Sequence, residues 1–342
     1  MTRRLAVRVC DDLGQVPAAG WDEVVEAAGA PIFYRHRYLS AYVASRLAGA
    51  EASACVVATR GGRPVAVAPA FLMSGYDPLR VLEPLLEGEP ERPRRLLVSH
   101  AWHCYDSTLP AIDAAALEAL CARMVELARE WGADGVAVVN VDAAARPELD
   151  SALRALGFRG AVVETRYRRA LVGLTTDAYV DGLPRSPRRT LRRYQRRGED
   201  AGVRVELLEP PLSGLDEFLD LCAISAAKHG NAAYYPRAAV ETVVRGLEPH
   251  VRLVRLRDGD GSTIAGSICL HDPPRFHSWA GGARYELGRA FSPNYLLFLA
   301  EIETALRLGC AVFEAGRRSD EFKRRYGMEP VPLTAYLRIA AP

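Results

Sequence analysis

The residue whose chemistry is most distinctive is Lys323, in the segment FKRRYG near the C-terminus. Lysine and arginine together number 44, yet only Lys228 and Lys323 are lysines. A lysine ammonium is a compact charge with three rotatable donors, whereas the planar guanidinium of arginine presents a fixed fork of donors. A lysine retained by chance is the alternative. The setting of Lys323 between Phe322 and Tyr326 favours a functional role.

Arginines are concentrated in residues 185–197, which contain seven of them. In a helix of about 100° per residue, four of these side chains project from one face. No carboxylate occurs between positions 185 and 198, so pairing within the helix cannot neutralise them. A solvated surface helix is the alternative. We predict that this helix binds the phosphates of tRNA or of a nucleotide-bearing substrate, through Arg185, Arg189, Arg192, Arg193 and Arg196.

Composition excludes several classes of protein. The net charge of +2 gives no global field toward nucleic acid or membranes, so any such binding must come from a local patch. The seven cysteines are scattered singly, with no CxxC pair and no Cys/His metal spacing, which indicates buried thiols in a reducing compartment and no metal site. No window contains the roughly 18–20 apolar residues of a membrane span, and the first residues do not form a signal peptide. We expect a soluble cytoplasmic protein that binds neither DNA nor membrane.

The order of predicted elements repeats along the chain. Each half contains helices, a β-hairpin, a further strand, a long helix, a strand, a small helix and a last strand. In the first half the hairpin is 52–59 with 64–72, joined by a Gly-Gly turn, and the long helix is 114–131. In the second half the corresponding segments are 251–257 with 263–271, and 293–308. We therefore predict an α/β (α+β) fold of two tandem domains, 1–172 and 173–342, each a mixed twisted sheet flanked by helices.

Local signals fix the last long helix and the strand after it. Ser292 stands at the N-cap position and Pro293 at the first helical position, where a missing N–H costs nothing. Gly309 follows the helix where a left-handed residue commonly ends it. Residues 311–313 then form a short buried strand, and the charged segment with Lys323 comes directly after it.

This layout resembles the tandem GNAT-fold proteins, specifically the FemABX-like transferases and related acyltransferases. Three segments carry the resemblance: SPRRTLRRYQRRGEDAGVRVE, AGGARYELGRAFSPNYLLFLAEIETALRLGC and FEAGRRSDEFKRRYG. The N-terminal WDEVVEAAGAPIFYRHRYLSAY is similar to the usual opening of that family. The chain lacks the coiled-coil arm that some FemABX members insert for tRNA contact. The resemblance implies two GNAT-like domains and transfer of an aminoacyl group from aminoacyl-tRNA to an amine.

Such a transfer is an attack by an amine on an ester, through a transition state that carries an oxyanion. It requires a positioned cation or donor and a group that accepts the amine proton. We predict that Lys323 is the cation and that Arg317 and Arg324 hold phosphate. Glu314 or Asp320 is the candidate proton acceptor, with an ion pair to Arg317, Arg318 or Arg325 as the favoured alternative role for both carboxylates. Tyr326 is the candidate donor to the leaving group, or a packing residue.

The acceptor pocket is predicted from the same resemblance. Its candidates are Lys228, Tyr234 and Tyr235 in a loop, His277 and Trp279 on a strand, and Asn294 at the start of the long helix. An exposed loop with aromatic residues covering the core is an equal alternative for the first three, and Trp279 is expected in the core. The cluster of His100, Trp102, His103, Tyr105 and Asp106 in the first half lacks metal-ligand spacing, so a packed aromatic-polar loop is the better interpretation.

Two further functions remain open. An acyl-CoA-dependent N-acyltransferase needs a loop of backbone N–H groups for the pyrophosphate. The segment Arg284–Ala290 has one residue too many for that loop, and Pro293 removes a donor near it. The other alternative is a non-catalytic module that binds tRNA or a nucleotide. We expect no tightly bound cofactor, aminoacyl-tRNA as co-substrate with acyl-CoA as the alternative, and a small-molecule amine acceptor in natural-product or peptidoglycan-type biosynthesis.

Overall fold

The computed structural model describes residues 4–75, 77, 79–87, 92–100, 102–285 and 290–340. The chain forms two compact units, which are Met1–Thr165 together with Val331–Pro342, and Arg166–Pro330. It passes from the first unit to the second along strand β6 (Arg159–Ala170) and returns along β12 (Glu329–Ile339). The last strand therefore belongs to the first unit, whereas the sequence-based division at 172/173 assigned it to the second.

The first unit is a mixed sheet with the strand order β1-β2-β3-β4-β5-β12-β6. The strands before β6 are β1 (Leu5–Cys10), β2 (Ala52–Arg60), β3 (Arg63–Ser74), β4 (Arg95–Val98) and β5 (Gly135–Val141). The helices are α1 (Ala18–Ala27), α2 (His36–Ser45), α3 (Glu83–Leu86), α4 (Ala114–Glu130) and α5 (Pro147–Ala155), with short 3-10 turns at Leu13–Gln15 and Ile32–Tyr34.

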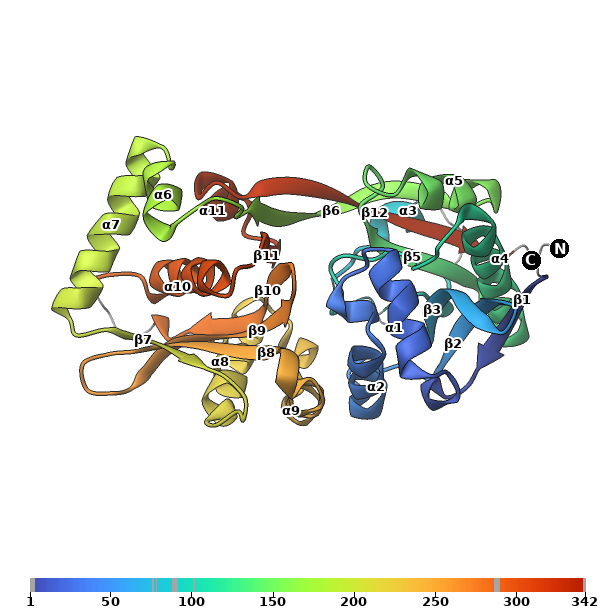
Figure 1. Ribbon diagram of the computed structural model, residues 1–342, viewed down its shortest axis with the longest axis horizontal. Coiled ribbons are helices and arrows are strands. Elements are labelled where there is room, and N and C mark those ends of the chain that lie inside the picture. The colour runs from blue at the N-terminus through green and yellow to red at the C-terminus, as the bar shows by residue number, and fades with distance from the viewer. Residues whose placement is uncertain are drawn as a thin grey trace. The chain divides into compact units, whose positions relative to one another are not determined.

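Helices pack on both faces of this sheet, and its central strands are therefore buried. Every residue of β5 is buried, as expected for a strand covered on two sides. Apolar residues of α4 pack against alternate residues of β2 and β3, such as Val56 and Ala68, and α5 packs beside α4 in the same core. Helices α1 and α2 lie on the opposite side of the sheet (Figure 1). The two faces together form the core of the first unit.

The second unit contains the strand order β6-β11-β10-β9-β8-β7. Its further strands are β7 (Arg204–Leu208), β8 (Val251–Arg257), β9 (Thr263–Asp272), β10 (Arg275–Ala283) and β11 (Val312–Arg317). The helices are α6 (Thr176–Asp181), α7 (Arg185–Asp200), α8 (Leu215–Lys228), α9 (Arg237–Gly246), α10 (Pro293–Arg307) and α11 (Asp320–Arg325), with 3-10 turns at Ala232–Tyr234 and Glu248–His250.

Helix α10 covers one face of β8–β10, and α8 with α9 covers the other (Figure 1). The apolar spacing of α10 predicts this, since its first and last turns carry Leu296, Leu297 and Ala305 on the buried side. Gly198 on α7 lets that helix approach α10, because a Cβ atom there would lie 2.7 Å from a methyl group of Leu296. Ser278 of β10 and Glu301 of α10, described below, meet on the face under α10.

Most predicted elements are present with boundaries within a few residues. The tandem repeat, both hairpins, the arginine helix and the last long helix are confirmed. The stretch 75–96 contains the short helix α3, and part of it lies outside the described residues. The charged segment around Lys323 is the helix α11, which lies where the small helix before the last strand was predicted.

Two consecutive glycines let strand β10 approach its neighbours closely. A Cβ atom on Gly281 would lie 2.5 Å from the carbonyl oxygen of Gly266 on β9. On Gly282 it would overlap the carbonyl oxygen of Leu221 on α8. Neither glycine has a positive φ angle. Glycine is therefore required at both positions because there is no room for a side chain.

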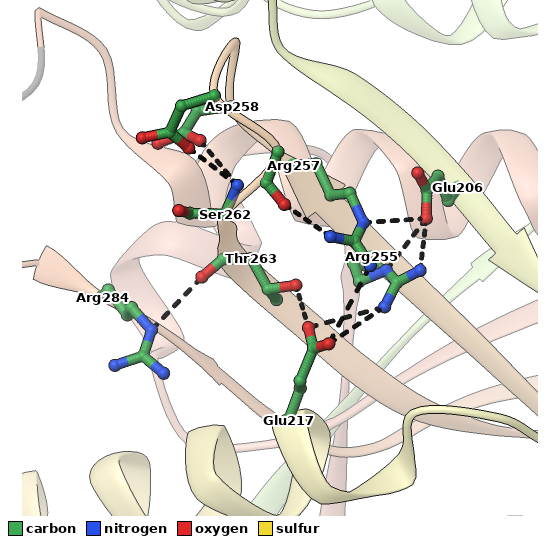
Figure 2. A network of polar contacts seen from close by, with 10 residues as sticks. Glu206, Glu217, Arg255, Arg257, Asp258, Ser262, Thr263 and Arg284 are labelled. Atoms are coloured by element: carbon green, nitrogen blue, oxygen red, sulfur yellow. Dashed lines mark hydrogen bonds and ion pairs between the residues drawn. The ribbon is translucent and has the colours of Figure 1, made fainter.

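Arginines on β8 are neutralised by a network of carboxylates around the second hairpin (Figure 2). Arg255 is 7% exposed, donates to Glu206 at 3.0 Å through Nε and contacts Glu217 at 3.5 Å. Arg257 contacts the same Glu206 at 3.2 Å, and Thr263 donates its hydroxyl proton to Glu217. Because these cations are already paired, the positive surface of the second unit is found elsewhere.

Candidate functional site

The parallel ladder between β10 and β11 ends partway along both strands. Three pairs join them, and the last is His277 with Glu314. Beyond this point β10 continues to Ala283 along β9, and β11 continues to Arg317 along β6. Ligands of α/β folds commonly bind where neighbouring parallel strands part at their carboxyl ends. We therefore assign the candidate site to the residues around this split.

Lys323 lies beside the end of β11. It is 8% exposed, and its Nζ donates to the carbonyl oxygen of Arg317 at 2.6 Å. The ammonium also lies 5.6 Å from the ring centre of Tyr167 on β6, within cation–π range. Burying an ammonium is costly unless it is hydrogen-bonded, so this lysine is held in a defined position rather than in solvent. A fixed cation is what stabilisation of an oxyanion requires.

Several predicted substrate-binding residues contact one another next to Lys323. Arg317 donates to the hydroxyl of Tyr234 at 3.3 Å, and the Tyr234 and Tyr235 rings meet edge to face at 4.8 Å. Tyr235 in turn donates to the carbonyl oxygen of Trp279 at 3.4 Å. Tyr234 and Tyr235 are partly exposed, whereas Trp279 is buried as expected. The aromatic loop therefore borders the side of the split formed by β10.

Glu314 and His277 lie within the sheet. Glu314 is 1% exposed and accepts a hydrogen bond from Arg166 at 3.0 Å, an ion pair in which both side chains are buried. An ion pair is the role that the sequence favoured for Glu314, and the partner shown here is Arg166 on β6, which the sequence did not propose. His277 is fully buried, and burial, with the nearby Arg275 and Arg166, holds its pKa well below 6.5. Asp320 is exposed in the first turn of α11.

Tyr326 belongs to an aromatic cluster under α10. Its ring packs 4.9 Å from Phe322 and 5.3 Å from Tyr295, and the residue is fully buried. Burial is the main reason that the pKa of its hydroxyl is raised to about 12. The backbone carbonyl of Tyr326 accepts a hydrogen bond from Tyr179 at 2.7 Å. These contacts support the packing alternative for Tyr326.

The structure adds Glu301, which the sequence analysis did not select, and pairs it with Ser278, which the sequence offered only as a residue that could line the cleft. Glu301, on the face of α10 that covers the sheet, is 5% exposed. It accepts a hydrogen bond at 3.1 Å from the hydroxyl of Ser278, which is partly exposed at the split on β10. Burial raises the pKa of Glu301 to about 7, while hydrogen bonds from Ser267 and Ser278 and the charge of Lys323 oppose the rise. A carboxyl that titrates near neutral pH is a candidate acid or base.

Helix α7 presents its arginines as predicted. The exposed side chains line a groove of about 510 Å³, formed by Arg185, Arg188, Arg189, Arg192, Gln195, Arg196 and Glu199. Arg192 is ion-paired with Asp181 on α6, just outside the segment in which the sequence shows no carboxylate. Arg193 instead lies 5.3 Å from the ring centre of Tyr194. Four of the five predicted phosphate-binding arginines therefore share one groove, and Arg193 lies outside it.

Helix α7 is also joined to the helix that carries Lys323. Arg325 donates to the Ser186 hydroxyl at 3.3 Å. The rings of Tyr194, Tyr295 and Phe322 meet in sequence at 5.1 and 5.0 Å, which links α7, α10 and α11. Arg324, the remaining predicted phosphate ligand, is exposed and donates to the Tyr167 hydroxyl at 3.1 Å.

A second, smaller cavity of about 330 Å³ lies at the N-terminus of α10. It is lined by Tyr194, Arg197, Arg284, Tyr285, Ala290, Phe291, Ser292 and Pro293. Ser292 is the N-cap residue but makes no capping hydrogen bond with its side chain. Lys228 lies 3.7 Å from the ring centre of Tyr285, so it belongs with this cavity. Asn294 is partly exposed in the adjoining first turn of α10. Residues 286–289 of the atypical pyrophosphate segment lie outside the described residues.

The corresponding split in the first unit is filled by the chain itself. Strands β4 and β5 pair in parallel only from Leu96 to Val98. Beyond them, Asn140 on β5 donates through its side chain to the carbonyl of Cys104 at 2.8 Å, and its own carbonyl accepts from Ser107 N–H at 2.9 Å. Asp113 caps α4 by accepting from Ala116 N–H and pairs with Arg60. An acidic cap at this helix terminus disfavours a bound phosphate.

The histidines of the same segment are packed in the core. His103 lies 2.8 Å from the Tyr42 hydroxyl, and His100 lies 2.8 Å from the Phe33 carbonyl oxygen. Both are buried among aromatic rings, in agreement with the packed-loop interpretation. Within the described ranges, no three His, Cys, Asp or Glu side chains are grouped so that they could hold a metal ion. No helix among these residues has the length and apolarity needed to cross a bilayer.

Comparison with known proteins identifies the class of fold. Residues 185–324 match the family model described as an acetyltransferase (GNAT) domain. This match runs from the arginine helix α7 into α11 and includes Ser278, Glu301 and Lys323. No curated protein matches the chain significantly.

Solved structures match the chain over nearly its whole length. FemX has a TM-score of 0.68 at 13% identity and covers 95% of this chain and 96% of its own. A tandem GNAT protein from the clavulanic acid biosynthesis pathway has a TM-score of 0.60 at 16% identity, covering 99% of both chains. L-PGS from Bacillus licheniformis has a TM-score of 0.57 at 11% identity and covers 94% and 91%. The protein therefore has the tandem GNAT fold, as the sequence predicted.

Proposed function

We propose that this protein is an aminoacyltransferase that forms an amide by moving an aminoacyl group from aminoacyl-tRNA to an amine. The observation that supports a tRNA donor is the groove of about 510 Å³ on α7, which is lined by five arginines and by Gln195 and Glu199. A groove with this excess of positive charge favours a phosphate backbone over a neutral ligand. The fold it shares with FemX and with L-PGS is consistent with this donor.

The link between α7 and α11 supports a role for both helices in one reaction. Arg325 and Ser186 join the two helices directly, at 3.3 Å. In the proposed reaction, α7 holds the tRNA backbone while Lys323 faces the developing oxyanion of the ester. Arg317 and Arg324 flank Lys323 and would contact phosphates near the aminoacylated end.

The acceptor is proposed to be a small amine that contacts Tyr234 and Tyr235. Both residues are partly exposed, and aromatic faces bind the apolar part of an amine or its cationic form. Such an acceptor fits a role in natural-product or peptidoglycan-type biosynthesis.

An acyl-CoA donor is the second candidate, and a different observation favours it. The cavity of about 330 Å³ at the N-terminus of α10 is lined by Arg197 and Arg284. The helix dipole and two cations would attract a pyrophosphate there. Arg197 and Arg284 are partly engaged by the carbonyl oxygens of Ala290 and Thr263, at 2.8 and 3.2 Å.

Direct binding distinguishes the two donors. The purified protein is titrated with labelled total tRNA and, separately, with CoA, each at two salt concentrations. For tRNA we expect binding whose affinity falls steeply with salt, because counterions are released from the backbone. Binding of CoA with no binding of tRNA would replace the proposal by the acyl-CoA reaction.

Transfer itself is tested with total tRNA charged with labelled amino acids and a panel of primary amines. The expected product is a labelled amide that survives mild alkali, whereas the ester on tRNA is hydrolysed. Deacylated tRNA released without an amide would contradict the proposal, since it indicates hydrolysis rather than transfer.

A further inference from the structure

We propose that Ser278 and Glu301 form a proton relay that takes the proton from the attacking amine and delivers it to the leaving oxygen. This inference rests on the proposed function, since it assigns a step in that reaction. It replaces the sequence-based candidates for the proton acceptor, Glu314 and Asp320, with a pair from β10 and α10.

The position of Ser278 supports the outer part of the relay. It is the residue directly after His277, where the pairing of β10 with β11 has just ended. The register of β10 with β9 shifts between Ser278 and Ala280, which marks a bulge at this point. Bulges re-aim side chains and are frequent next to active sites. Ser278 is also partly exposed rather than buried.

Glu301 supplies the inner part. The hydroxyl of Ser278 donates to Oε1 of Glu301 at 3.1 Å, and Glu301 is buried beneath it. Because the hydroxyl proton points at the carboxylate, the lone pairs of Oγ are left to accept a proton from another donor. A base that is itself shielded from water can therefore act through the hydroxyl above it.

The contrast with Glu314 identifies which buried carboxyl is suited to exchange a proton. Glu314 is ion-paired with the buried guanidinium of Arg166 at 3.0 Å. Glu301 forms no ion pair with any residue in the described part of the chain, and its partners are hydroxyl groups. An unpaired buried carboxyl is easily protonated, since desolvation disfavours its charge.

The surroundings of Glu301 set its titration near neutral pH. The groups that face it are Ser267 and Cys269 on β9, Ser278 on β10 and Lys323 on α11. Desolvation raises its pKa to about 7, against the opposing effects of the two hydroxyls and the ammonium. A base with a pKa near the working pH is the most effective, since it is ionised yet still basic.

The proton taken from the amine is returned to the leaving oxygen within one reaction. The lone pair of a neutral amine forms the new C–N bond at the ester carbonyl, while Lys323 faces the oxyanion. The amine proton passes to Oγ of Ser278 as the hydroxyl proton moves to Glu301. When the C–O bond breaks, the leaving ribose oxygen takes a proton back through Ser278, and the carboxylate is restored.

The pH profile of transfer tests the relay. For the unmodified protein, kcat/KM is expected to rise with pH through about 7, because Glu301 must be ionised to accept a proton. Glu301→Gln is expected to lower kcat/KM by about 100- to 10,000-fold and to abolish its rise with pH through about 7. Both proteins use the same acceptor, so ionisation of the acceptor amine contributes equally to the two profiles.

Three further variants complete the test. Ser278→Ala is expected to lose activity as Glu301→Gln does, and Ser278→Thr to recover most of it, because the hydroxyl is restored. Glu303→Gln is the matched control, since Glu303 is an exposed glutamate on the same helix, and it is expected to leave rate and profile unchanged. Thermal unfolding and tRNA binding of each variant establish that it is folded and still binds its donor.

The outcomes separate the relay from the reaction it serves. If the unmodified protein makes no amide, the proposed function fails. If the unmodified protein transfers the aminoacyl group, and Glu301→Gln keeps both the same kcat/KM and the same rise with pH, the relay is overturned. An aminoacyl group found on Ser278 by mass spectrometry also overturns it, because the hydroxyl would then act as a nucleophile.

Discussion

The ammonium of Lys323 donates to the carbonyl oxygen of Arg317 at 2.6 Å, and this bond ties helix α11 to the end of strand β11. The contact accounts for a lysine at this position. A point-like ammonium fits between a carbonyl oxygen and the ring of Tyr167, where a planar guanidinium would need more room.

Lys323→Ala and Lys323→Arg are both expected to lower kcat/KM for transfer by about 100- to 1,000-fold, the usual cost of removing one oxyanion donor. Binding of tRNA is expected to stay within a few-fold of the unmodified protein, as measured by fluorescence anisotropy. Arg129→Ala, on an exposed position of the first unit, serves as the control. Undiminished transfer in Lys323→Ala would remove this residue from the mechanism. Loss of transfer with retained binding would exclude the purely binding module.

Arg189→Ala is expected to weaken tRNA binding more than Arg192→Ala, because Arg192 is already engaged by Asp181. Together the two changes should reduce the slope of log K against log salt by about 1–2, roughly one for each phosphate contact that is lost. The control is Arg237→Ala, an exposed arginine paired with Asp216 and Asp220 outside the groove. Equal slopes for the double variant and the control would mean that tRNA does not occupy the groove.

Glu314→Gln is expected to destabilise the protein by about 3–5 kcal/mol, because the buried charge of Arg166 would lose the carboxylate paired with it. Urea unfolding followed by circular dichroism measures this change. The double variant Arg166→Met with Glu314→Leu is expected to recover most of the loss, since neither charge is then buried. Full stability in Glu314→Gln would show that the pair is dispensable for folding.

Gly282→Ala is expected to cost about 1–3 kcal/mol, because the new methyl group would overlap the carbonyl oxygen of Leu221 and force β10 away from α8. Gly20→Ala on α1 is the matched comparison. Its methyl group would meet Pro64 at an ordinary 3.5 Å, and the gain in helix propensity should raise stability by about 0.5–1 kcal/mol. Thermal unfolding of the two variants should therefore shift in opposite directions.

The sequence was sufficient for the fold because its signals are local. The Gly-Gly turn of the first hairpin and the Ser292-Pro293 start of α10 each depend on a few neighbouring residues. These local signals do not predict which strands pair with each other. Arg166 and Glu314 are 148 positions apart, and only the antiparallel register of β6 with β11 brings them together.

Glu301 was missed although the sequence holds a signal for it. Its helical neighbours four residues away are Leu297 and Ala305, and no lysine or arginine stands three or four positions from it. A lone glutamate on an apolar face is unusual, because its charge is then buried without a partner. The role of Ser278 was harder to predict from the sequence, since it depends on the bulge in β10 and on where the β10–β11 ladder ends.

The return of β12 to the first unit also determines the order in which the protein can be completed during synthesis. Residues 166–330 leave the ribosome before Val331–Pro342, so the second unit can fold while the first still lacks a strand between β5 and β6. The aromatic ring of Tyr336, buried in the core of the first unit, arrives last. A nascent chain stalled when residue 330 has just left the exit tunnel should therefore carry a protease-resistant second unit and a first unit that is still open to cleavage.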